Sequence, residues 1–165
     1  MRKKPSERSA ALYTGLFLLC AFAMAGVFAL RGKLPIQTMD GYWQHYTVLG
    51  YISKAVRGLL SGKGIAMNSP YLGQGMDVLT TLSYYGLTDP LNLLSALFTE
   101  DQIWIAYIAI AALRIYLCGL AFLLLARELG CKNGWANAAG ALMYVFCGFS
   151  LFNLAPHILH QRHAL

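Results

Sequence analysis

Charged side chains are scarce in this chain of 165 residues. Lys, Arg, Asp and Glu make up 12% of it, whereas 58% is hydrophobic, and ordinary soluble domains carry about 25% charged residues. This scarcity argues against a soluble domain and favours a membrane protein. A nucleic-acid partner is not expected either, because no basic face interleaved with exposed rings is present.

Acidic residues are absent from three apolar stretches, at residues 11–30, 102–126 and 135–156. Each is long enough for a helix of about 20 residues, which crosses a hydrocarbon core. The first exceeds the 7–15 apolar residues of a usual signal peptide, so we expect it to be retained. The sequence therefore predicts an all-α polytopic membrane protein with three transmembrane helices, a basic N-terminus (1–10), a long first loop (31–101), a short loop (127–134) and a tail (157–165).

Basic residues mark the two segments expected to be cytoplasmic. Arg2, Lys3, Lys4 and Arg8 precede the first span, and Arg127 and Lys132 lie in the short loop after the second. By the positive-inside rule, the N-terminus and this loop are cytoplasmic. The first loop and the tail are then extracytoplasmic.

Cysteine is rare, and its spacing excludes two kinds of site. The four cysteines, Cys20, Cys118, Cys131 and Cys147, are not spaced like zinc ligands or a disulfide framework. His157, His160 and His163 could bind a metal, but a polar tail explains them better, so no metal site is predicted. A G-x-S-x-G nucleophile motif is also absent.

The first loop contains an amphipathic pattern. Apolar residues recur at helical spacing from Val48 to Leu60, with Ser53, Lys54 and Arg57 on the other side. Such a helix either lies in the membrane interface or packs on its own domain, and the sequence leaves both open. The glycines of "SGKGI" end it.

The second half of this loop predicts irregular backbone followed by short helices. Gly73 and Gly75 precede Asp77, after which a short helix is expected. Asp89 stands before Pro90, and this order is typical of a helix N-cap followed by proline in the first turn. We therefore expect Asp89 to cap a helix that begins with "PLNLLSALF".

Asp40 is the first candidate for chemistry. A carboxylate at the outer mouth of a span could act as a general base on an acceptor hydroxyl, or could help to hold a divalent cation as cofactor. It could also be the N-cap of the helix that contains Trp43 to Leu60, and the spacing alone favours this structural role. The two roles are compatible.

Aromatic residues and one arginine are further candidates. Trp43 and Tyr46 could stack on sugar faces, although Trp and Tyr also gather at membrane interfaces. Arg114 lies near the centre of the second span, where a charge costs at least about 2.5 kcal/mol. It could pair with the phosphate of a lipid-linked substrate, or with an acid or backbone carbonyl of another helix. No acid lies inside the predicted spans, so its partner lies outside them or is not protein.

Several of these segments together resemble a known family. The stretches "DGYWQHYTVLGYISKAVRGLLSGKG", "SPYLGQGMDVLTTLSYYGLTDPLNLLSALF" and "GALMYVFCGF", between residues 39 and 149, resemble the start of YfhO-like bacterial membrane proteins. The resemblance implies a GT-C-type glycosyltransferase in the bacterial cytoplasmic membrane. It implies Asp40 as the catalytic acid and Gln44 as a polar residue one helical turn on, with Asp77 as a second recurring acid.

The function expected from the resemblance is sugar transfer on the outer face of the membrane. The donor would be a polyprenyl-phosphate-linked sugar and the acceptor a cell-envelope glycopolymer or lipid, with Trp43, Gln44, Tyr46, Asp77 and Arg114 contributing to substrate binding. Family members have many more spans, so we expect a fragment, a truncated product or a subunit. The alternative is a small non-catalytic membrane protein that binds or moves a lipid carrier.

Overall fold

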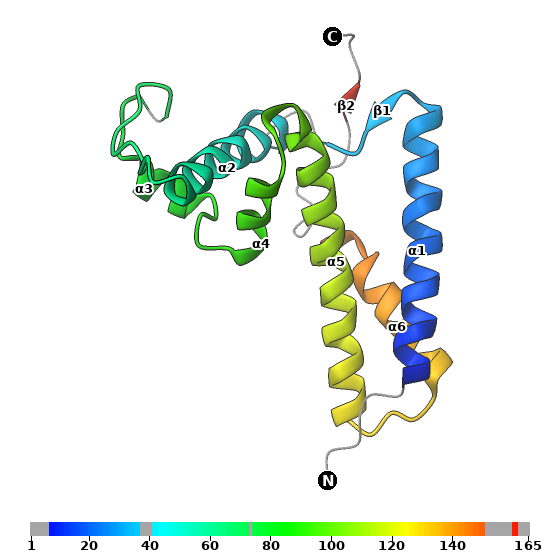
Figure 1. Cartoon of the computed structure of the whole chain (residues 1–165). Coiled ribbons are helices and arrows are strands. Elements are labelled where there is room, and N and C mark those ends of the chain that lie inside the picture. The colour runs from blue at the N-terminus through cyan, green and yellow to red at the C-terminus, as the bar shows by residue number, and fades with distance from the viewer. Residues whose placement is uncertain (1–6, 37–40, 73, 151–159, 162–165) are drawn as a thin grey trace. The chain divides into compact units, whose positions relative to one another are not determined.

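The computed structural model describes residues 7–36, 41–72, 74–150 and 160–161, and it is mostly helical (Figure 1). The chain forms two compact units, Met1–Ile36 with Ala111–Leu165 (unit 1) and Gln37–Ile110 (unit 2). The elements in chain order are α1 (Glu7–Leu30), β1 (Lys33–Leu34), the π-helix η1 (Gly41–Tyr46), α2 (Thr47–Leu60), α3 (Val78–Tyr84), α4 (Pro90–Leu93), the 3₁₀ turns η2 (Leu94–Leu97) and η3 (Glu100–Gln102), α5 (Ile103–Glu128), α6 (Gly134–Val145) and β2 (His160–Gln161).

Two of the described helices are long and apolar enough to cross a membrane. They are α1, from Arg8 onward, and α5 with the turn before it. At 1.5 Å per residue, the 24 residues of α1 and the 26 of α5 extend about 36 and 39 Å, which exceeds a hydrocarbon core of about 30 Å. Both leave large apolar side chains uncovered by the rest of the chain, such as Leu19 and Phe22 on α1 and Leu124 and Leu125 on α5. A lipid environment would cover such surfaces.

Unit 1 is held together by close helix packing around one tyrosine. The side chain of Tyr13, on α1, is fully buried and its hydroxyl donates to the carbonyl of Tyr116 at 3.0 Å. Gly119 lies so close to this ring that any added Cβ would overlap it. Ala138, Ala141 and Val145 of α6 complete the same buried cluster. Small residues at helix contacts allow this close approach, as is common in membrane helix pairs.

The predicted third span is only partly described. α6 contains 12 residues and ends at Val145, and residues 151–156 of the predicted span lie outside the described part of the chain. Close to the helix end, the Ser150 hydroxyl donates to the carbonyl of Tyr144 at 2.7 Å, so it satisfies a backbone acceptor of the last turn. A single uninterrupted helix from 135 onward is therefore not observed, and the third span stays a prediction.

A short antiparallel pairing is the exception to the predicted all-α fold. Lys33 pairs with Gln161 and Leu34 with His160, both within unit 1. Sequence periodicity could not predict two-residue strands, because alternation identifies a strand only over a run of about four to eight residues. His160 is the described member of the histidine tail, and His157 and His163 lie outside the described residues.

Unit 2 is built on the apolar face of α2. Val48 and Ile52 are buried in a cluster with Leu72, Val78 and Leu82, so this part of the helix packs on its own unit. Ser53 was predicted on the polar side, and that prediction is wrong: it is fully buried, and its hydroxyl donates to the carbonyl of Ser95 at 3.0 Å.

The predicted cap at Asp89 and the predicted end of α2 are confirmed, whereas the predicted cap at Asp40 lies outside the described residues. The side chain of Asp89 accepts from the amide of Leu91 at 2.9 Å, with Pro90 in the first helical turn. The helix continues through α4 into η2, which tightens to a 3₁₀ turn. α2 ends at Leu60, and Gly62 follows at φ 74°, a conformation that favours glycine.

Candidate functional site

The candidate site is centred on η1, the π-helical turn "GYWQHY" that leads directly into α2. Tyr46, the last residue of η1, has helical dihedral angles, so η1 and α2 form one continuous helical segment. π-Helical turns are rare and are found frequently at functional sites. Gly41 at the start of the turn is buried, whereas the side chain of Trp43 is 74% exposed. The turn therefore presents a large ring outward.

Aromatic side chains from three segments meet at this turn. Tyr42 stacks on Tyr46 at 5.4 Å between centroids and contacts Trp43 edge-on at the same distance. His45 contacts Tyr85 edge-on at 6.0 Å. The rings that make up this cluster are Tyr42, Trp43, His45, Tyr46, Tyr84, Tyr85 and Tyr107.

Gln44 connects the turn to the residues after α3. Its side-chain carbonyl oxygen accepts a hydrogen bond from the Tyr85 hydroxyl at 3.1 Å. The Gln44 side chain is exposed. Gln44 therefore links the turn to Tyr85 and places a polar side chain at the surface of the ring cluster.

Tyr46 lies where the ring cluster meets a pocket. Its ring contacts Tyr107 edge-on at 6.1 Å. Burial, and to a lesser extent the neighbouring Tyr42, raises the pKa of the Tyr46 phenol above its ordinary value. The hydroxyl therefore stays protonated near neutral pH and can donate a hydrogen bond.

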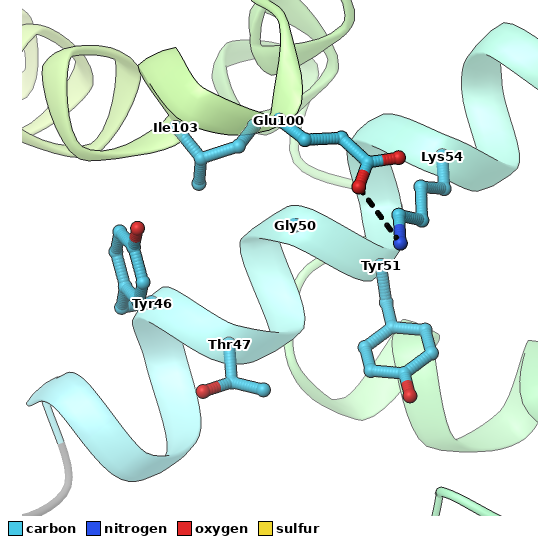
Figure 2. A pocket seen from close by; sticks show the side chains of 7 residues that line it. All are labelled: Tyr46, Thr47, Gly50, Tyr51, Lys54, Glu100 and Ile103. Carbon is cyan, nitrogen blue, oxygen red and sulfur yellow. Dashed lines mark ion pairs between the residues drawn. The ribbon is translucent and has the colours of Figure 1, made fainter.

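The pocket has a volume of about 260 Å³ and is bordered by α2 and the start of α5. Figure 2 shows Tyr46 and Ile103 on one side of Gly50, and Lys54 with Glu100 on the other. Thr47 and Tyr51 also line it. We call it the Gly50 pocket.

An ion pair bounds the Gly50 pocket. Lys54 Nζ lies 3.2 Å from Glu100 Oε2, and the two side chains are 57% and 64% exposed. At that exposure an ion pair contributes only about 0–1 kcal/mol to stability. Thr99 and Gln102 form a capping box around the turn that contains Glu100. This local hydrogen bonding fixes the backbone at Glu100 independently of the ion pair.

The structure brings together only part of the predicted site. Trp43, Gln44 and Tyr46 lie on one turn, η1, whereas Asp40 lies outside the described residues. Arg114 is half-buried in the part of α5 that belongs to unit 1. Among the described residues, no group of three or more His, Cys, Asp or Glu side chains is arranged to hold a metal ion.

Sequence reasoning missed Gly50, Lys54 and Glu100 as members of a pocket. The sequence could have indicated part of this pocket. Tyr46, Gly50 and Lys54 follow one another every four residues and so share one face of a helix. Glu100 could not have been found this way, because it approaches Lys54 only through the fold of unit 2.

Asp77, predicted to bind substrate, has a structural role in this fold. Its carboxylate accepts a hydrogen bond from the amide of Thr80 at 2.6 Å and so caps α3. Hydrogen bonds from Thr80, first from its side chain and then from its backbone, lower the pKa of the Asp77 carboxyl. The ionised cap therefore stabilises the start of α3.

The Asp77 cap predicts that the local stability of α3 depends on pH. Since the folded-state pKa is lowered, the stabilisation is fully present above the unfolded value of about 3.9 and is lost as the pH falls through the folded value. Peptide-level hydrogen exchange over residues 78–84, corrected for intrinsic rates, should show protection that decreases in that acidic range. In Asp77→Asn, which keeps the cap but does not titrate, protection should not change across the same range. An equal pH dependence in both proteins would contradict this assignment.

Two apolar helices of membrane length are consistent with a helical membrane protein. A protein-family model described as "Bacterial membrane protein YfhO" matches residues 14–158. The chain belongs to this family of bacterial membrane proteins. No curated protein and no solved structure shows significant similarity to the chain.

Proposed function

We propose that this chain is part of a GT-C-type membrane glycosyltransferase that takes a sugar from a polyprenyl-phosphate carrier and transfers it to a cell-envelope acceptor outside the cytoplasm. The observation that carries the proposal is the ring-bearing turn η1, which begins directly after Asp40 in the sequence. Exposed aromatic faces such as that of Trp43 stack on the apolar faces of sugars. Family membership supports a role in the bacterial membrane.

In this proposal the chemistry is divided among a base, a binding surface and a phosphate contact. Asp40 would remove the proton of the acceptor hydroxyl as that oxygen attacks the anomeric carbon, and the carrier phosphate would leave. Trp43, Gln44 and Tyr46 would hold the sugar. Arg114 would pair with a phosphate, since a guanidinium binds phosphate oxygens through paired hydrogen bonds. A divalent cation would be a further means of stabilising the leaving phosphate.

Membranes from cells that express the gene, incubated with a polyprenyl-phosphate hexose carrying a radioactive label, test this function. Incorporation of label into glycopolymer or glycolipid above the level of vector-only membranes is the expected result. Absence of transfer, together with specific retention of the lipid carrier by the purified chain, would favour the non-catalytic lipid-binding alternative. An in-frame continuation encoding further spans in the adjacent DNA would favour the enzyme over a subunit.

The proposed orientation places the N-terminus in the cytoplasm and the first loop, residues 31–101, outside. The pairing of β1 with β2 supports a third crossing, because paired strands lie on the same side of a membrane. A crossing by α5 between these strands would then require a return crossing before residue 160. α6 and the residues after it are the segment available for that return.

Thiol labelling of intact cells tests the orientation. Cys131 is exposed in the turn after α5, and Lys63, after α2, is an exposed position for an introduced cysteine. A membrane-impermeant maleimide should label Lys63→Cys on intact cells, with Cys131 replaced by serine. It should label the native Cys131 only after the membrane is opened. Labelling of Cys131 on intact cells would reverse the proposed topology.

A further inference from the structure

The Gly50 pocket has open space over Gly50, because glycine carries no side chain. Tyr46, Gly50 and Lys54 lie at four-residue intervals along one face of the continuous helical segment. A Cβ placed on Gly50 would meet no atom within 4 Å. Glycine inside a helix costs about 0.5–1 kcal/mol relative to alanine, and local packing does not require it here. The space over Gly50 is therefore open to a ligand.

The groups around this space suit a neutral ligand with many hydroxyls. Tyr46 offers a ring and a protonated hydroxyl, and Ile103 offers an apolar surface on the same side of Gly50 (Figure 2). Lys54 can donate hydrogen bonds and Glu100 can accept them. A sugar ring has both features, with C–H faces for the aromatic ring and hydroxyls for the charged pair.

The charges of the pocket disfavour an anion. Lys54 and Glu100 cancel each other at 3.2 Å. A phosphate bound beside Lys54 would also approach the Glu100 carboxylate, and like charges repel at short range. The pocket is therefore suited to the sugar and not to the phosphate of a lipid-linked donor.

We propose that the Gly50 pocket is a subsite for one neutral pyranose ring. Its volume of about 260 Å³ lies just below the range of about 300–1,000 Å³ that holds drug-sized ligands, which is compatible with a single ring. The inference rests on the proposed function, because that function supplies two sources of such a ring, the donor sugar and the terminal sugar of the acceptor.

Binding measured without turnover tests the subsite. The full chain, purified in detergent, is titrated with methyl α-D-glucoside, methyl α-D-galactoside and methyl N-acetyl-β-D-glucosaminide, and saturation-transfer NMR detects the bound ring. We expect at least one glycoside to bind, and Gly50→Leu to weaken that binding at least about tenfold by filling the pocket. Inorganic phosphate at equal concentration should not compete.

Gly15→Leu is the matched control. Gly15 lies inside α1 in unit 1, and a Cβ there also meets nothing within 4 Å, so this variant makes the same change away from the pocket and should bind the glycoside normally. Gly50→Ala, the smaller change, should fold normally and weaken binding less than leucine does. Wild-type affinity in a folded Gly50→Leu protein, binding of no glycoside, or displacement by phosphate would overturn the subsite.

The experiments distinguish failure of the pyranose subsite from failure of the proposed glycosyltransferase activity. Sugar transfer by the wild type with glycoside binding that does not depend on Gly50 would remove the subsite and leave the enzyme. Binding that depends on Gly50, in a protein that transfers no sugar, would leave the subsite and remove the enzyme. Competition between the glycoside and a polyprenyl-phosphate hexose would identify the ring as the donor's, and absence of competition as the acceptor's.

Discussion

Replacing Asp40 with asparagine is expected to reduce sugar transfer by about 10²- to 10⁴-fold, the range that a positioned general base contributes. Asparagine has nearly the same size and caps helices as well as aspartate does. The substitution therefore preserves any capping role of Asp40 at the start of η1 and removes only the ability to accept a proton. Transfer of labelled hexose from a polyprenyl-phosphate donor, normalised to the amount of protein in the membrane, measures the effect.

Asp101→Asn is the control for this experiment. Asp101 is an exposed acid of the same loop, in the turn η3, and its replacement changes the net charge by the same amount. Transfer should remain close to the wild-type rate. Full activity in Asp40→Asn would exclude Asp40 as the base. Equal loss in both variants would mean that the loop responds to its total charge and not to one carboxylate.

Replacing Gly119 with alanine is expected to destabilise unit 1. The new methyl group would overlap the ring of Tyr13, and overpacking of this kind costs about 1–3 kcal/mol. Higher helix propensity would offset at most about 1 kcal/mol of that cost. The thermal midpoint of the full chain in detergent should therefore fall by several degrees. Gly15→Ala, where the added group meets nothing within 4 Å, should not lower it.

The same substitution in the Tyr13→Ala protein shows whether contact with the Tyr13 ring causes the lower thermal midpoint. In Tyr13→Ala the ring is absent, so adding Gly119→Ala should produce no further decrease in the thermal midpoint. The two substitutions are in contact and should not be additive. An identical decrease in both backgrounds would show that Gly119 is needed for a reason other than its contact with Tyr13.

Local signals in the sequence predicted the elements of this protein well. Asp89 before Pro90 correctly indicated a helix start, because a cap depends on atoms only two or three residues apart. The glycines after Leu60 correctly indicated the end of α2. The long apolar stretches of α1 and α5 were recognisable because membrane length is a property of consecutive residues.

Contacts between distant segments were not predictable in the same way. The spacing assigned Ser53 to the polar face, since periodicity counts only whether a side chain is polar. Its hydroxyl is nevertheless buried, because the carbonyl of Ser95 accepts its hydrogen bond. Asp77 is a different case, because its hydrogen bond from the Thr80 amide is local and a cap of this kind depends on neighbouring residues.

The sequence by itself determined the class of this protein, its two membrane-length helices and the position of its aromatic turn, because each depends on composition or on neighbours along one helix. Only the tertiary structure decided that part of the apolar face of α2 is covered by its own unit, and that Glu100 meets Lys54 beside Gly50. The physical reason is that a pocket is formed by side chains from segments far apart in the chain, and their approach depends on how the whole unit packs.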